Sequence, residues 1–159
     1  MATNSGLYVA NWLDILNGTQ LAVDYTLANS VKLALYNSTG FSAANFSTEQ
    51  YYNTTNELPT GGNYTQGGQA LSGLSLTESP SGKVKFTAST VTWTNTTLSN
   101  ISCGKLYFVN DASDSAFGSG AKPLIGLVYF GVAGPYNTVN GDFKVQWPTT
   151  GIFSINLTP

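Results

Sequence analysis

The sequence predicts a mainly β protein, folded as an antiparallel β-sandwich or barrel-like sandwich with one N-terminal α-helix. Three observations lead to this fold class. Runs of alternating apolar and polar residues recur along the chain, turns rich in Gly, Pro and Asn separate them, and helical periodicity is confined to the first stretch. Strand and helix patterns do not alternate, which argues against a parallel doubly wound sheet. At this length of 159 residues, positions 1–159 are expected to form a single domain.

The composition fits this class and argues against several kinds of partner. Aromatic residues make up 13% of the chain, whereas charged residues make up 9%, against ~25% in a typical soluble domain. The formal net charge is -2, and every cation is a lysine. Without a basic surface or any Arg, neither a nucleic acid nor a membrane surface is expected as a partner. Neither a signal peptide nor a membrane-spanning stretch is expected.

The first stretch, NSGLYVANWLDILNG, predicts a helix over residues 5–17. Asn4 or Ser5 can cap its start, and Gly18 can end it. Its apolar residues recur at helical spacing: Leu7, Tyr8, Trp12, Ile15 and Leu16. Such an amphipathic helix covers either its own sheet or a neighbouring subunit, and its own sheet is the favoured interpretation.

A strand is expected at residues 30–37, followed by a long polar connection. Ser47 and Gln50 have the spacing of a capping box, which predicts a short helix or turn near 47–58. The connection also carries several aromatic residues: Phe41, Phe46, Tyr51 and Tyr52. A loop of this length in a compact domain usually has a role, so these rings are expected to pack on the sheet or on a partner.

The rest of the chain reads as strands and turns. Strands are expected at 69–79, 83–95, 105–111, 123–131, 141–147 and 151–157. Gly73 suggests a bulge in the first of these, and the alternation of the second shifts phase near Ser89. The segment 123–131 is almost wholly apolar, as expected for a central strand that is covered on both faces.

Between these parts lies LPTGGNYTQGGQALSG, residues 58–73, with two glycine pairs around Tyr64. The segment matches neither GxGxxG nor GxxxxGK[ST], and a strand follows it, so a phosphate-binding loop is not expected. Its four glycines, Gly61, Gly62, Gly67 and Gly68, are instead expected to supply positive φ angles around an extended segment anchored by Tyr64.

Few residues suggest catalysis. The chain has no His and a single Cys, Cys103, which excludes His-dependent nucleophilic catalysis and a structural zinc site. Its eight carboxylates occupy positions typical of solvated acids, so the facing pair of a glycosidase is not expected. The stretch NDASD, 110–114, can supply oxygen ligands for Ca²⁺, but an ordinary turn is favoured. The sequence therefore predicts no catalytic residue, no metal and no cofactor.

Three further residues have a packing interpretation. Cys103 leads into an apolar run and is expected to be a small buried hydrophobe. Trp93 and Trp147 fall on the apolar phase of strands, so both are expected in the core rather than on a sugar-binding platform.

Five blocks together resemble a family of small virion proteins of tailed phages, variously called minor capsid, decoration, head-fibre or minor tail proteins. The blocks, in chain order, are DILNG with VKLALYN, ELPTGGNYTQGGQAL, TVTWTN, PLIGLVYFG, and NGDFKVQWPTTGIFSINL. Their order and spacing span most of the chain. The resemblance implies a structural protein of the virion without catalysis, assembled in the host cytoplasm.

The resemblance leaves head and tail open. The favoured expectation is a capsid decoration, cement or head-fibre protein that binds the major capsid protein, as a homo-oligomer and preferably a trimer. The alternatives are a minor tail or tail-fibre protein of the same family, and a glycan-binding β-sandwich module. Candidate interface residues are Leu7, Tyr8, Trp12, Phe41, Phe46, Tyr51, Tyr52 and Tyr64.

Overall fold

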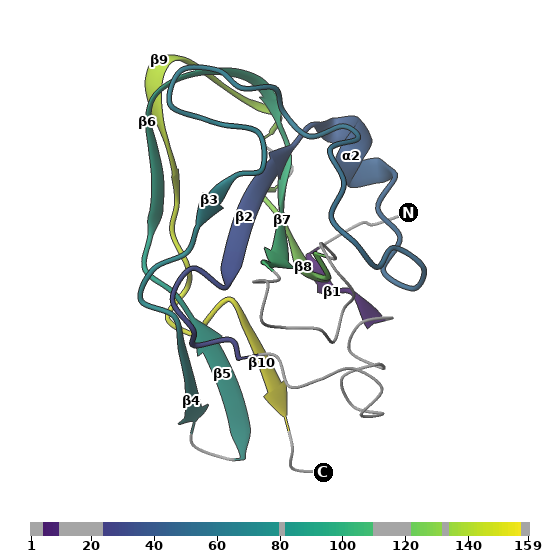
Figure 1. Ribbon diagram of the computed structural model, residues 1–159, viewed down its shortest axis with the longest axis vertical. Helices are drawn as coiled ribbons and strands as arrows, with labels where there is room; N and C mark the ends of the chain where they lie inside the picture. Colours follow the sequence, from purple (N-terminus) through teal and green to yellow (C-terminus); the bar gives the residue numbers. More distant parts are fainter. Residues whose placement is uncertain (1–4, 10–23, 80–81, 110–121, 132–133, 157–159) are drawn as a thin grey trace.

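The computed structural model describes residues 5–9, 24–79, 82–109, 122–131 and 134–156. The protein is mainly β and its strands pair antiparallel, as the sequence predicts. The elements, drawn in Figure 1, are β1 Gly6–Leu7, β2 Val31–Tyr36, α2 Ser38–Ser42, β3 Gln69–Ala70, β4 Ser75–Ser79, β5 Lys83–Thr87, β6 Val91–Ile101, β7 Cys103–Phe108, β8 Leu124–Tyr129, β9 Tyr136–Val145 and β10 Phe153–Asn156.

The strands of the described residues form three sheets. The largest has five strands in the order β1-β8-β7-β2-β3, the second has the order β10-β5-β4, and the third pairs β6 with β9. Figure 1 shows β6 and β9 side by side as a long ribbon, with β4, β5 and β10 at the lower end of the molecule. Strand β6 directly follows β5 in the chain, and β10 directly follows β9. The chain therefore passes twice between the two smaller sheets.

The main hydrophobic core lies between the five-stranded sheet and the two smaller sheets. Alternate residues of β2 point into it, as the period-2 pattern predicts. Buried members from the three sheets include Val31, Leu33, Leu35, Phe86, Val91, Trp93, Leu98, Ile101, Leu106 and Val145. Each such side chain contributes about 1.5–3 kcal/mol when fully buried. The expected core position of Trp93 is confirmed, since it is 3% exposed.

A second core covers the opposite face of the five-stranded sheet. It contains Tyr8, Ala34, Tyr36, Ala44, Cys103, Tyr107, Leu124 and Leu127. The connection after β2 supplies aromatic rings to this face: Phe41 stacks on Tyr129 at 4.1 Å between ring centroids, and Tyr52 stacks on Tyr107 at 4.2 Å. The expectation that the connection packs onto the sheet is therefore confirmed, and every residue of β7 is buried.

The predicted start of the N-terminal helix is wrong, and the connection after β2 has a helix that the sequence did not predict. Residues 6–7 of the predicted helix over 5–17 form strand β1, which pairs with β8; positions 10–17, with Trp12, lie outside the described residues. The connection also contains a helix at Ser38–Ser42, where Gly40 N–H donates to the Asn37 side chain. The prediction of a short helix or turn near 47–58 is confirmed as a turn, since Ser47 N–H donates to Asn45 Oδ1, and Tyr51 then bridges to Pro123. This pairing draws the chain into an extended course that a helix cannot follow.

Strand boundaries shift where glycine and asparagine interrupt the alternation. The predicted strand 69–79 is two strands in different sheets, separated by Gly73 at φ +60°. The predicted strand 83–95 is also divided, at the phase shift near Ser89. In turn, β6 continues to Ile101 and β9 starts at Tyr136, well outside the predicted limits. Register shifts between β6 and β9 hide the alternation in both.

Candidate functional site

The glycine segment around Tyr64 fits tightly between strands of two sheets. A Cβ at Gly62 would lie 2.1 Å from the Asn95 carbonyl oxygen of β6, and one at Gly68 would lie 1.9 Å from the Leu33 carbonyl oxygen of β2. The expected positive φ angles are confirmed at Gly62 (+61°) and Gly68 (+67°) and also at Gly67 (+98°). The segment therefore joins the two sheets through its backbone.

Gly61 differs from the other three glycines of this segment, because its φ is not positive. Its lack of a side chain matters for another reason: a Cβ there would lie 2.5 Å from the carbonyl oxygen of Thr97. Gly61 and Tyr64 exchange backbone hydrogen bonds, which closes the turn between them. All four glycines of the segment therefore have a structural use: three adopt positive φ angles, and Gly61 allows the close approach to Thr97.

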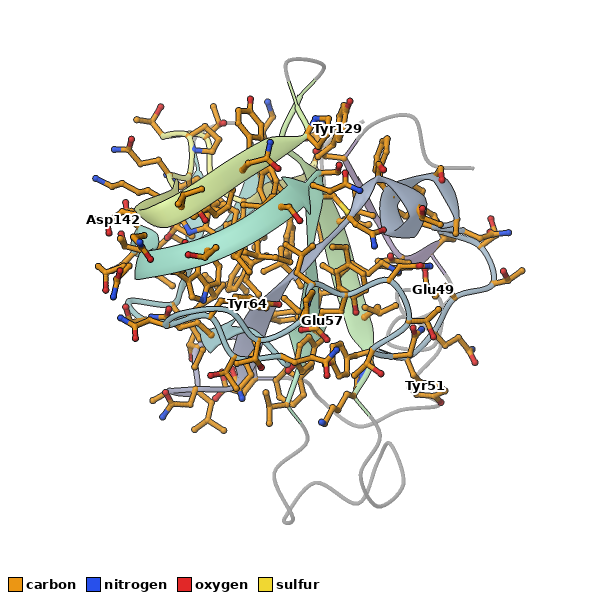
Figure 2. The ribbon with its side chains drawn as sticks, turned by 90° about the horizontal axis from the view of Figure 1, so that it is seen from above. Glu49, Tyr51, Glu57, Tyr64, Tyr129 and Asp142 are labelled. Atoms are coloured by element: carbon orange, nitrogen blue, oxygen red, sulfur yellow. The ribbon has the colours of Figure 1, made fainter. Side chains whose placement is uncertain are left out.

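A buried carboxylate, Glu57, organises this segment. It is 6% exposed and accepts three hydrogen bonds: from the Tyr52 hydroxyl at 2.5 Å, the Tyr64 hydroxyl at 2.8 Å and the Gly67 N–H at 2.6 Å. Figure 2 shows Glu57 and Tyr64 near each other in the middle of the molecule. A buried carboxylate needs such donors, because its desolvation is costly. Sequence reasoning missed Glu57, since nothing in ELPTGG marks the acid as buried.

The phenols around Glu57 are held in their neutral, donating form. Burial, followed by the charge of Glu57, raises the pKa of Tyr64 well above its ordinary value. Burial and then the hydrogen bond to Glu57 raise the pKa of Tyr52. Tyr107, stacked on Tyr52, donates to the Gly67 carbonyl oxygen at 2.6 Å. The geometry is that of a closed hydrogen-bond network, and it exposes no reactive group.

A second polar cluster lies on the other side of the connection. The Lys105 Nζ of β7 lies 2.5 Å from Glu49 Oε1, and their side chains are 5% and 17% exposed. Glu49 Oε2 accepts a hydrogen bond from Tyr8, and Asn53 Nδ2 lies 3.5 Å from Glu49 Oε1. A cavity of about 230 Å³ borders this cluster. In Figure 2 Glu49 lies on the side of the molecule formed by the connection.

A second cavity is an apolar groove of about 750 Å³. One wall comes from β1 and β8, and the other comes from β9, β10 and the segment between them. Its large apolar lining residues are Leu7, Leu106, Leu127, Val128, Tyr129, Phe130, Tyr136, Phe143, Val145, Trp147, Ile152 and Phe153. Among the described residues that line the groove, Lys144 alone carries a charge. Several of these side chains also pack against the main core, whereas Tyr136 is 38% exposed. A concave, mainly apolar surface is typical of a binding site.

The groove follows a side of the fold where strand pairing is incomplete. Among the described residues, β9 has β6 as its one strand partner, although it is 10 residues long. Aromatic contacts shape the wall on this side: Phe143 meets Phe130 edge-on at 5.5 Å and lies 6.2 Å from Trp93. The Trp147 indole donates to the Ser89 carbonyl oxygen, which fixes its ring at the groove.

The structure places the candidate interface residues in three environments. Tyr8 and Tyr64 are 0% exposed, and Phe41, Phe46 and Tyr52 pack on the second core. Leu7 lines the groove and Tyr51 is 42% exposed, whereas Trp12 lies outside the described residues. Figure 2 shows Tyr51 at the periphery. Contact with a partner stays a prediction, and Leu7 and Tyr51 are the residues best placed for it.

The other acidic residues add little to the site. Asp24 and Asp142 accept hydrogen bonds from backbone N–H groups on the exposed surface, and Asp142 lies at the edge of the molecule in Figure 2. In the part of the chain that the structure describes, no three His, Cys, Asp or Glu side chains gather as metal ligands. Asp111 and Asp114 lie outside that part.

Cys103 is 0% exposed, and burial raises the pKa of its thiol to about 12. This confirms its expected role as a buried hydrophobe. Within the described ranges, none of the helices has the length and apolar character required to cross a membrane.

Comparisons of this chain with protein-family models, with curated proteins and with solved structures found no match.

Proposed function

We propose that the protein is a structural virion protein of a tailed phage, folded as one antiparallel β-sandwich that binds the capsid exterior as a decoration, cement or head-fibre protein. The five sequence blocks that resemble this family support the proposal. Two of them, ELPTGGNYTQGGQAL and PLIGLVYFG, supply the segment that joins the sheets and strand β8 beside the groove.

The observation that carries the proposal is the apolar groove. The described residues that line this aromatic groove include one charged residue, Lys144. Such a groove suits docking by shape and by apolar contacts. Such docking depends little on salt, because few charges are screened. Many identical sites on a capsid add avidity, so a modest affinity at each site is sufficient. The proposed occupant is an apolar, uncharged segment of the major capsid protein.

The rest of the assembly follows from the same proposal. The protein forms a homo-oligomer, preferably a trimer at a capsid threefold position, and is assembled in the host cytoplasm into the virion. It acts without a catalytic residue, cofactor, nucleic acid or membrane. Placement on the tail, as a minor tail or tail-fibre protein, is the alternative within the same family.

A glycan-binding module is a second alternative, from another class. Trp147 favours it, because the ring is half-buried and lines the groove, where a sugar can stack on it. Trp93 does not contribute, since it is 3% exposed. A glycan array that shows no saturable binding to the purified chain would exclude this alternative.

Co-sedimentation of the purified protein with expanded, DNA-free capsid shells of a tailed phage tests the main proposal. The double variant Gln146→Arg/Ser154→Arg places two charges at the groove and is expected to lose at least about tenfold in affinity. Thr77→Arg, on exposed strand β4, is the matched control and is expected to bind as the native chain does. A native chain that stays monomeric and never sediments with shells contradicts the decoration role.

A further inference from the structure

The cluster of Lys105, Glu49 and Asn53 brings an amine, a carboxylate and a carboxamide to one point of the fold. Glu49 Oε1 lies 2.5 Å from Lys105 Nζ and 3.5 Å from Asn53 Nδ2, so one oxygen is close to both nitrogens. The three residues come from two segments: Lys105 from β7, and Glu49 and Asn53 from the connection that covers the sheet. None of these three residues lines the apolar groove.

The surroundings hold each group in place. Lys105 is 4% exposed, and its Nζ lies 4.7 Å from the Tyr36 ring centroid. The Asn53 carbonyl oxygen accepts a hydrogen bond from the Tyr36 hydroxyl at 2.5 Å, which fixes its backbone. The side-chain oxygen Oδ1 of Asn53 accepts the Thr55 N–H at 3.0 Å. Asn53 is exposed, and these two hydrogen bonds orient its backbone and its side-chain amide.

We propose that Lys105 and Asn53 form an intramolecular amide bond between Nζ and Cγ, with Glu49 as the acid and base of the reaction. The proposal does not depend on the virion role or on the groove. The residues fit the three chemical demands of such a bond: a nucleophile kept from water, a carboxylate that contacts both nitrogens, and an N–H donor on the oxygen of the attacked amide.

The reaction balances without any other reactant. Glu49 takes a proton from the Lys105 ammonium group, and the lone pair of Nζ then attacks Cγ of Asn53. The Thr55 N–H stabilises the negative charge that develops on Oδ1. Glu49 passes this proton to Nδ2, the bond between Cγ and Nδ2 breaks, and Glu49 takes the second surplus proton from Nζ and hands it to the departing ammonia. One ammonium group and one primary amide become a secondary amide and an ammonium ion, and nothing is oxidised or reduced.

Such a bond would tie β7 to the connection that forms the second core. It closes the chain between positions 53 and 105, which restricts the unfolded ensemble as a disulfide does. Unlike a disulfide, it resists reduction. It would also remove the charged amine from a site where Lys105 is 4% exposed.

Intact-mass spectrometry of the folded, full-length protein tests the proposal. The native chain is expected to weigh one ammonia less than its sequence, relative to Lys105→Arg, which cannot form the bond and keeps the charge. Glu49→Gln is expected to keep the ammonia while retaining a folded near-ultraviolet circular dichroism spectrum. Lys122→Arg, which replaces an exposed lysine, is the control and is expected to show the same loss as the native chain.

A tryptic map locates the bond. Trypsin spares a modified Lys105 and does not cleave before Pro123, so the linked chain yields peptide 33–83 joined to peptide 86–144. The unlinked chain yields 33–83, 86–105 and 106–144 separately. The native protein is also expected to melt at a higher temperature than Lys105→Arg. A native protein that keeps its full sequence mass after prolonged incubation in the folded state, and that yields the three separate peptides, overturns the proposal.

Discussion

The Tyr64 hydroxyl and the Leu35 backbone nitrogen lie 3.0 Å apart, and the Leu35 N–H donates to the hydroxyl oxygen. Strand β3 pairs with β2 only at Lys32 and Leu33, so the edge of β2 lacks a strand partner at Leu35. The side chain of Tyr64 satisfies this N–H, and its own proton goes to Glu57. The Tyr64 hydroxyl thus gives the N–H at the edge of β2 an acceptor, and it offsets part of the desolvation free energy of the buried Glu57 carboxylate.

Replacing Tyr64 by Phe is expected to destabilise the protein by about 2–4 kcal/mol, because it leaves the Leu35 N–H without its partner and removes one of the three hydrogen bonds that the buried Glu57 carboxylate accepts. Urea denaturation followed by Trp fluorescence measures the change. Tyr51→Phe is the matched control, since Tyr51 is 42% exposed, and we expect its effect to stay within about 0.5 kcal/mol. Equal midpoints for the two variants would show that the Tyr64 hydroxyl contributes nothing.

Alanine variants at two glycines with positive φ distinguish the cost of backbone strain from the cost of steric overlap. At Gly68, φ is +67° and a Cβ would lie 1.9 Å from the Leu33 carbonyl oxygen, so Gly68→Ala is expected to cost at least about 3 kcal/mol. At Gly131, φ is +99° with nothing within 4 Å, so Gly131→Ala is expected to cost about 1 kcal/mol. Denaturation midpoints compare the two. A Gly68→Ala protein as stable as Gly131→Ala would contradict the close approach to β2.

Alkaline pH is expected to unfold the protein through its buried tyrosines. Burial raises the pKa of several of them above the ordinary value of 10.0: Tyr8, Tyr25, Tyr36, Tyr52, Tyr64 and Tyr107. Above pH 10 the unfolded chain releases these protons while the folded chain keeps them, so the free energy of unfolding falls as the pH rises. The loss is about 1.4 kcal/mol per pH unit for a fully buried phenol.

The measurement for this prediction is the phenolate absorbance and the circular dichroism of the same samples between pH 9 and 13, a window of about four units around the ordinary tyrosine pKa. The raised tyrosines are expected to ionise together with loss of structure. Stability below pH 10 is expected to be unaffected by these groups. Full phenolate absorbance with intact circular dichroism would contradict their burial.

Much of the fold could be predicted because its signals are local. The strand at Val31–Tyr36 and the apolar strand at Leu124–Tyr129 agree with the predictions for 30–37 and 123–131. Alternation and apolar runs are properties of neighbouring residues, so they survive without knowledge of the fold. The positive φ of Gly62, Gly67 and Gly68 was predictable for the same reason, since glycine density marks a backbone that side chains cannot follow.

Other parts depended on pairing between distant residues. The helical spacing around Leu7 suggested a helix, yet Gly6–Leu7 pairs with Leu127 and Gly126 of β8. Tertiary hydrogen bonds outweighed a weak local preference. The length of β9 was hidden because Asn140, with a positive φ, breaks the alternation at an irregularity in its pairing with β6. The burial of Glu57 likewise required donors from Tyr52 and Tyr64, which local pattern cannot reveal.

The sequence by itself determined a mainly β chain with low charge, packed aromatic residues and glycine-rich turns, because composition and periodicity reflect each residue's preference for backbone shape and burial. Only the tertiary structure decided which residues meet. It set Glu57 among hydroxyl donors, Lys105 against Glu49 and Asn53, and left an apolar groove beside β8 and β9. These relationships arise when strands far apart in the chain pair in a particular register, and that register depends on the packing of the whole molecule.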